Sequence, residues 1–579
     1  ARRNTNAIST FKKNYSLGTH DTTIVSESDD LTNFDNAFDK ETTTKIDCSK
    51  VKATYLTSPM GNRFENMTDF VFPANLANIS TSKGVLSGCK KLTKITFPIA
   101  YCDISHPESF LANSTFVNGL ELPYTLNFVP MVSVDGQTGI EEIKQNEILK
   151  GSHVVGNLNI KAATTNKCVV YVNKETTSLV IYPATVQGRF YLMGKGIDGD
   201  LSGLQTIQIG RSTNINDTDG FASNTSANIN LSLDFQSGNC TTKIPKNAFN
   251  GYSGNTINVV IYGNVTDSNG ITLESGSFCN MPNMTKLPMT NSISLKVIPE
   301  NCMNNLASLT LATTGYVVDV EGCNDMPNLT TLRIESSCEI VNGFNNCPKL
   351  KNLSFMSDGK VKEIGGLNSN AITTFYIPNM ALSVSGVNNC SALTTVVIGA
   401  SLTSFTGFNN CPKLNKFTVD SSNTTFKVVD NNLCQGNKLC RVPMSKSDIV
   451  VTNGTTEIMS NAIQIAFVNS ISIPNGCILA NDSIKCQSVG QIILHTSFNT
   501  ETGKYNNLTM TDFSTLDNVQ VGTIFTYGNG ITDTTNANCL PIVKYCIEHN
   551  INYVDMNETN TNARGAIGIS GNAELDGDN

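Results

Sequence analysis

Seven hexapeptides between Met284 and Val419 follow one pattern: MTKLPM (284–289), LASLTL (306–311), LTTLRI (329–334), LKNLSF (350–355), ITTFYI (372–377), LTTVVI (393–398) and LNKFTV (414–419). Each has an apolar residue at its first, fourth and sixth position. The interval between successive first positions is nearly constant, at about 21–23 residues, and a short repeat at so regular an interval predicts a solenoid. One coil cannot bury its own apolar edge, so the coils must stack.

The spacing of the apolar positions, with Asn or Cys nearby, is the L-x-x-L-x-L pattern of leucine-rich repeats. We therefore predict an α/β to mostly-β solenoid, a leucine-rich repeat array with coils of about 21–23 residues. The predicted repeat core consists of the repeated leucines and of the cysteines three residues ahead of a repeat: Leu306, Leu329, Leu350, Leu353, Leu393, Leu414, Cys347, Cys390 and Cys411.

The composition excludes several classes of partner. The net charge is -8, which argues against nucleic acid because such a ligand requires a basic face. No run of 18 apolar residues occurs, so no membrane-spanning helix is encoded. The first residues, ARRNTNAISTFKKNYS (1–16), are not followed by the apolar stretch of a signal peptide. A signal was removed earlier, or the protein is delivered without one.

The 18 cysteines are expected to pack rather than to pair. Ser369 and Met326 fill the place that Cys347, Cys390 and Cys411 occupy in their coils. A place that accepts Cys, Ser or Met is a packing position, where a free thiol behaves as a small hydrophobe. We predict mostly buried, reduced thiols. The alternative is that some of them form disulfides.

Four segments are predicted along the chain. Residues 1–72 show no repeat and are expected to form a polar leader or attachment segment. Residues 73–270 carry short β-rich runs with irregular spacing, and residues 271–500 carry the regular repeats. Residues 501–579 are expected to form a C-terminal cap of one helix and one strand, followed by a tail. Such a cap would cover the open edge of the last coil.

One stretch resembles a known family. FKVVDNNL (426–433) and NKLCRVP (437–443), followed by a strand, a turn and EIMSNAI (457–463), are similar to the hairpin coil of BspA-like leucine-rich repeat proteins. The matching positions are Phe426, Val428, Val429, Asp430, Leu433, Leu439, Arg441, Val442 and Pro443. The resemblance implies a surface protein of the adhesin type that binds host proteins or other cells. The chain departs from the family in having few Ala-Phe dipeptides.

No constellation of residues points to chemistry. None of the five histidines has a His, Cys or carboxylate partner at metal-ligand spacing, so no metal site is predicted. The glycine-rich GKGIDGDLSG (194–203) lacks the order of a phosphate-binding loop, and no nucleophile motif occurs. We therefore predict that the protein is not an enzyme and has no cofactor.

Strand residues between the apolar positions should point outward and form a row across the sheet. The candidate binding residues in this row are Lys286, Arg333, Tyr376, Val397 and Thr418. Arg and Tyr often supply interface energy. The alternative is an ordinary solvated strand face.

The leading functional hypothesis is a non-enzymatic binding or adhesion protein. It would recognise a protein or cell-surface ligand and would be extracellular or surface-exposed. The alternative is a structural component of a large assembly, such as a virion or a surface filament, anchored or self-assembled through its termini. A remote alternative is an enzyme with a solenoid accessory.

Overall fold

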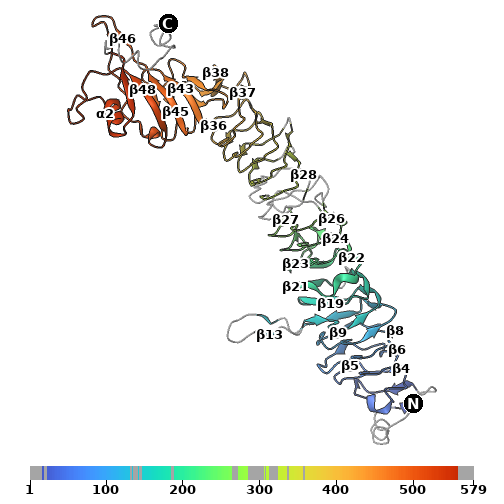
Figure 1. Cartoon of the computed structure of the whole chain (residues 1–579). Helices are drawn as coiled ribbons and strands as arrows, with labels where there is room; N and C mark the ends of the chain where they lie inside the picture. Colours follow the sequence, from blue (N-terminus) through green and yellow to red (C-terminus); the bar gives the residue numbers. More distant parts are fainter. Residues whose placement is uncertain are drawn as a thin grey trace. The chain divides into compact units, whose positions relative to one another are not determined.

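The computed structural model describes residues 22–130, 146–183, 188–263, 271–284, 306, 324–334, 338–356 and 359–557, together with the backbone of four short strands at 16–17, 133–134, 141–142 and 308–311. The chain divides into two compact units, Ala1–Cys338 and Glu339–Asn579. Both consist mainly of short parallel strands, one coil following another (Figure 1). The predicted solenoid is confirmed in each unit.

Two sheets begin the first unit. One contains, in order, β1 (Ser16–Leu17), β2 (Thr23–Ser26), β4 (Lys45–Val51), β6 (Asp69–Val71) and β8 (Lys94–Thr96). The other contains β3 (Asp30–Leu31), β5 (Tyr55–Leu56), β7 (Asn78–Ile79), β9 (Cys102–Ile104), β12 (Leu126–Phe128) and β18 (Ala163–Thr164). A 3-10 turn, η1 (Asp35–Ala37), lies between β3 and β4. Apart from the antiparallel β1–β2 pair, all neighbours are parallel, so each coil adds one strand to each sheet.

A second pair of sheets continues the first unit. The longer sheet contains β11 (Leu120–Leu122), β17 (Gly156–Ile160), β20 (Thr176–Ile181), β22 (Thr206–Ile209), β24 (Asn228–Asp234) and β26 (Ile257–Tyr262). The other contains β15 (Glu147–Ile148), β19 (Cys168–Val172), β21 (Phe190–Gly199) and β23 (Thr213–Thr218). Smaller elements are the pairs β10 (Thr115–Phe116) with β16 (His153–Val154), β13 (Ser133–Val134) with β14 (Glu141–Glu142), β25 (Lys243–Ile244) with β27 (Thr272–Leu273), β28 (Ser308–Leu311) with β29 (Thr331–Ile334), and the turn η2 (Leu201–Gly203).

The coils of the first unit differ in length. Leu158 lies beside Leu179, and Leu179 lies beside Ile207. Ile207 in turn lies beside Ile229, and Ile229 lies beside Ile257, so a shorter coil alternates with a longer one. All five side chains are buried. The irregular spacing that the sequence shows here is therefore absorbed in the returns, while the buried strand positions stay in register.

The structure differs from the polar leader expected at residues 1–72. Lys45 of β4 lies beside Asp69 of β6, and Asp69 lies beside Lys94 of β8, so residues 22–72 already belong to the solenoid. The reason is visible in MTDFVF (67–72), whose Met67, Phe70 and Phe72 fill the first, fourth and sixth positions and are all buried. Bulky Met and Phe replace Leu and Ile in this coil. The divisions expected at residues 270 and 500 stay predictions.

The second unit has four main sheets. The first sheet contains β33 (Thr374–Tyr376), β35 (Thr395–Ile398) and β37 (Lys416–Val419), and the second contains β30 (Ile340–Val341), β32 (Glu363–Ile364), β34 (Ser383–Val384) and β36 (Ser404–Phe405). The third sheet contains β38 (Phe426–Val429), β39 (Asn432–Gln435), β40 (Lys438–Arg441), β42 (Glu457–Ile458) and β44 (Ile478–Leu479). The fourth contains β41 (Asp448–Val450), β43 (Phe467–Ile473), β45 (Ser488–Leu494), β48 (Gln520–Thr526) and β49 (Asn552–Asp555). Further elements are β31 (Asn352–Phe355), the hairpin β46 (Phe498–Asn499) with β47 (Lys504–Tyr505), and η3 (Ser514–Leu516).

The stretch that resembles the BspA-like pattern forms antiparallel pairs, β38 with β39 and β39 with β40, within a mainly parallel unit. Arg441, at the end of β40, is buried and donates hydrogen bonds to the carbonyl oxygens of Gly407 (2.7 Å) and Phe408 (2.9 Å). Burial lowers the pKa of this guanidinium to about 10. The arginine of the pattern thus satisfies turn carbonyls of the preceding coils.

The helix and strand predicted near the C-terminus are both present. α2 (Pro541–Glu548) begins with proline at its first position, which suits the fixed backbone angle of that residue. Ile542, Val543 and Cys546 of α2 are buried in the core of the last coils. β49 pairs in parallel with β48. That these two elements act as a cap stays a prediction.

Candidate binding site

The outward row predicted on the sheet is only partly assembled. Tyr376, Val397 and Thr418 lie side by side on β33, β35 and β37. Tyr376 is 59% exposed, whereas Val397 and Thr418 are half-buried. Arg333 is exposed on β29 in the first unit. Lys286 lies outside the described residues.

In the second unit, Tyr376, Val397 and Thr418 line a hollow of about 650 Å³. Its apolar lining includes side chains from the strands and from the turns that follow them: Leu353, Phe355, Met356, Ile377, Pro378, Met380, Val397 and Val419. β31 and β33 are not paired with each other, so the sheet is open at this point. Leu353 and Phe355 are consequently only half-buried, although the repeat pattern assigned Leu353 to the core.

Apolar side chains stand at the mouth of the hollow beside polar ones. Met380, which the sequence interpretation missed, is 52% exposed next to Tyr376. Asp420 accepts hydrogen bonds from the hydroxyl and the amide of Ser422, and these bonds hold its pKa below the ordinary value. Lys416 lies two residues before Thr418 on β37, so its exposed side chain points to the same face. The arrangement suits an apolar anchor surrounded by polar contacts. The sequence feature that could have pointed to Met380 is the turn I-P-N-M (377–380), which directly follows β33.

The other residues assigned to the repeat core are buried. Leu306, Leu329, Leu350, Leu393 and Leu414 are at most 4% exposed. The thiols of Cys390 and Cys411 each lie 3.5 Å from the carbonyl oxygen of the asparagine two residues earlier, and that of Cys347 lies 3.9 Å from the equivalent oxygen. All but Cys539 of the sixteen cysteines among the described residues are buried. This agrees with the packing role inferred from the repeat.

Among the described residues, no group of three His, Cys, Asp or Glu side chains is placed to hold a metal ion. The most reactive-looking contact joins Ser472 Oγ to His495 Nε2 at 2.7 Å. Burial lowers the pKa of His495. The neighbouring carboxylate, Asp448, accepts instead from Ser470 Oγ at 2.7 Å. Among the described residues, no side chain is hydrogen-bonded to Nδ1 of His495, so this contact lacks the third group of a nucleophilic triad.

Within the part of the chain that the structure describes, no helix has both the length and the apolar character needed to cross a bilayer. The one described α-helix, α2, has eight residues and an exposed charged face with Lys544 and Glu548.

The chain matches no known family model, and no curated protein is similar to it in sequence. Solved structures similar to it include a leucine-rich cell surface protein from Faecalibacterium prausnitzii, with 16% identity over 62% of this chain and 85% of that chain and a TM-score of 0.29. A leucine-rich repeat protein from Eubacterium ventriosum has 12% identity over 42% of this chain and 74% of its own, with a TM-score of 0.29. The pneumococcal vaccine antigen PcpA has 12% identity over 68% and 85%, with a TM-score of 0.22.

Because these TM-scores are low, the assignment of the fold rests on this chain's own register. Thr374, Thr395 and Lys416 lie side by side, at the constant interval that the sequence predicts. The repeat strands are parallel. In the seven regular repeats, the described apolar positions are buried except at Leu353 and Phe355 and at Val419 in the last repeat. By these features the chain is a leucine-rich repeat solenoid, the fold implied by its resemblance to BspA-like proteins.

Proposed function

We propose that the protein is a non-enzymatic binding protein that is exposed at a surface and recognises a protein ligand through the hollow of its second unit. The observation that supports this most directly is the exposed pair Tyr376 and Met380 at the mouth of an apolar hollow. Large exposed apolar side chains over a concavity are typical of interaction sites rather than of ordinary surface.

The proposed ligand inserts one apolar side chain into the hollow. Leu353 and Phe355 are half-buried and would lose their remaining contact with water when an anchor side chain covers them. Tyr376 would pack along the anchor, because its ring combines a large apolar area with a polar tip. Asp420, which lines the hollow, would contact a polar group that flanks the anchor and would set its orientation.

Selection of peptides from a random displayed library on the immobilised full chain tests the proposal. Enriched peptides should share an apolar residue between polar ones. Their affinity for Tyr376→Ser or Met380→Ser chains should fall by about tenfold or more, as expected for loss of an interface anchor. Tyr55→Ser is the matched control, because Tyr55 is 55% exposed but lies in the first unit. Peptides that bind all these chains equally would contradict the proposed site.

The structural role in a large assembly stays a hypothesis. It depends on the two ends of the chain, and residues 1–15 and 558–579 lie outside the described residues.

A further inference from the structure

The first unit also has a place where the strands of two consecutive coils are not paired. This place lies between β8 and β11. β8 is the last strand of one sheet and β11 is the first strand of the next, although they belong to consecutive coils. The cause is a short excursion of the chain before β11. Val117 still donates to the carbonyl oxygen of Leu92 (2.9 Å), but Asn118 and Gly119 then form a turn that displaces β11 from β8. Gly119 has a positive φ of 77°.

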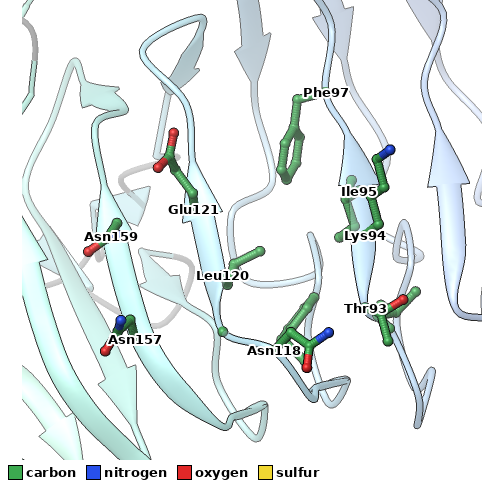
Figure 2. A pocket seen from close by; sticks show the side chains of 12 residues that line it. Thr93, Lys94, Ile95, Phe97, Asn118, Leu120, Glu121, Asn157 and Asn159 are labelled. Atoms are coloured by element: carbon green, nitrogen blue, oxygen red, sulfur yellow. The ribbon is translucent and has the colours of Figure 1, made fainter.

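The interruption leaves an open groove of about 330 Å³ (Figure 2). At about 30 Å³ per molecule in the liquid, this volume corresponds to roughly ten waters. Phe97 and Leu120 project into the space between the two strands in Figure 2. Ile95 and Phe97, which the repeat pattern places inward, are only half-buried here. The floor of the groove is therefore apolar and in contact with solvent.

Both walls of the groove are strand edges whose backbone is not paired across the gap. The amide of Lys94 donates to the carbonyl oxygen of Thr68 (3.0 Å), and the carbonyl of Thr96 accepts from Phe72 (2.9 Å), so both face β6. Because successive residues of a parallel strand face opposite neighbours, the N–H and C=O of Ile95 face the groove. On β11, the carbonyl of Leu122 accepts from Lys161 (2.8 Å) on the β17 side, so the backbone of Glu121 faces the groove.

The two charged side chains that line the groove differ in whether they form an ion pair. They are Lys94 and Glu121. Glu121 Oε1 accepts from Lys161 Nζ at 3.1 Å, which draws its carboxylate toward β17 and neutralises it. Lys94 has no ion-pair partner among the described residues. The groove thus presents the amino group of Lys94 beside an apolar floor, and the nearest acidic neighbour in register, Asp69 of β6, lies on the side away from the groove.

We propose that this groove takes up an extended segment of a partner protein, which inserts as a strand between β8 and β11. Addition of a strand to open sheet edges is a general mode of peptide recognition, with main-chain bonds for affinity and alternate side chains for specificity. The inserted segment would bond to Ile95 on one side and to Glu121 on the other. Its inward side chains are apolar, to cover Ile95, Phe97 and Leu120. An outward acidic side chain meets Lys94.

A labelled peptide provides the probe. Fluorescein-Gly-Thr-Ile-Glu-Ile-Thr-Gly-amide has two apolar side chains on one face and one acid on the other, and its binding to the full chain is measured by fluorescence anisotropy. We expect saturable binding, together with slower hydrogen exchange at the amides of Ile95 and Glu121. The same peptide N-methylated at both isoleucines keeps the side chains but loses two backbone donors. Its affinity should be at least about tenfold lower, as expected for loss of two hydrogen bonds.

Charge exchange tests the role of Lys94. The exposed Lys94→Glu change should weaken binding of the acidic peptide by about five- to tenfold and strengthen binding of the peptide with Lys in place of Glu. Lys83→Glu, a change of equal charge at an exposed residue outside the groove, should have no effect. Thermal melting should stay cooperative in all three chains, with a small loss of stability for Lys94→Glu because its new carboxylate lies opposite Asp69.

Three results would overturn strand insertion: equal binding of the N-methylated peptide, binding without protection of Ile95 and Glu121, or no saturable binding at all. If the peptide does not bind and the full chain instead self-associates, the occupant of the groove would be a second copy of the chain. The groove and the hollow over Tyr376 lie in different units and share no residue, so either proposal can fail while the other holds.

Discussion

Individual leucines of the repeat differ in how much stability they contribute, although the sequence pattern treats them alike. Leu393 is fully buried between coils, whereas Leu353 is half-buried at the edge of the hollow. Replacing Leu393 with Ala should cost about 2–5 kcal/mol, because it removes buried methyl groups and leaves a cavity. Leu353→Ala should cost less than half as much.

Denaturant unfolding of the two variants and the parent chain, followed by a probe in the second unit, gives this comparison. Equal losses of stability would show that the strand at Leu353 is packed like the other coils, which would contradict the open sheet described there.

At the same scale, the turn asparagines show what a repeat motif encodes. In the sequence G-x-N-N-C, the second asparagine has a left-handed backbone at Asn346 (φ 58°), Asn389 (φ 57°) and Asn410 (φ 54°). Asn tolerates this conformation better than other residues with a side chain. Asn410 Nδ2 also donates to Asn389 Oδ1 of the preceding coil at 3.1 Å. The left-handed backbone and the bond between asparagines of successive turns both depend on local chemistry, so both can be inferred from the repeated G-x-N-N-C sequence.

At the scale of elements, α2 should stabilise the last coil through its buried face. Ile542 is fully buried and Tyr545 donates from its hydroxyl to Asp517 Oδ1 at 2.8 Å. Ile542→Ala should cost about 2–5 kcal/mol and should speed amide exchange in β49, which pairs with β48 next to the helix. Lys544→Ala, on the exposed side of α2, is the control and should change neither quantity. Unchanged exchange in β49 with Ile542→Ala would mean that the helix is not part of this coil's cooperative unit.

The two openings of the sheets mark the limit of prediction at this scale. LTKITF (92–97) has the full apolar pattern, so the strand β8 could be predicted from it. That β8 lacks a partner on the side of β11 depends on Asn118 and Gly119, which are ordinary turn residues and carry no signal that distinguishes a displaced strand from a paired one. The hollow at Leu353 and the groove at Ile95 therefore emerge only from the packing of consecutive coils. The same reason explains why Met380 was missed.

At the scale of the molecule, the buried thiols make stability sensitive to alkaline pH. Burial raises the pKa of Cys89, Cys477 and Cys486 from 9.0 to about 11. Above pH 9 these thiols ionise in the unfolded chain but stay protonated in the folded one. The unfolded state then binds fewer protons, so the stability that is fully present below pH 9 is lost as the pH rises toward 11.

Denaturation midpoints between pH 8 and pH 11 measure this loss. For Cys89 alone, it amounts to about 1.4 kcal/mol for each unit by which the pH exceeds 9, up to the pKa of the folded thiol. Cys89→Ala should lower the midpoint at every pH through lost packing, but its decline with pH should be shallower than in the parent chain. Parallel declines in the two proteins would rule out a contribution from this thiol.

The parallel ladder, one strand per coil, also determines how either unit responds to tension. Ladder hydrogen bonds lie across the strands, along the direction in which the coils stack. A pull on the end of the chain peels off the outermost coil, because that coil is bonded to a neighbour on one side only, so coils are expected to detach in sequence rather than all at once. Each regular coil, from one strand to its neighbour, would release about 70 Å of extended chain at low force. Such a solenoid would therefore lengthen under tension in a series of small steps, one coil at a time.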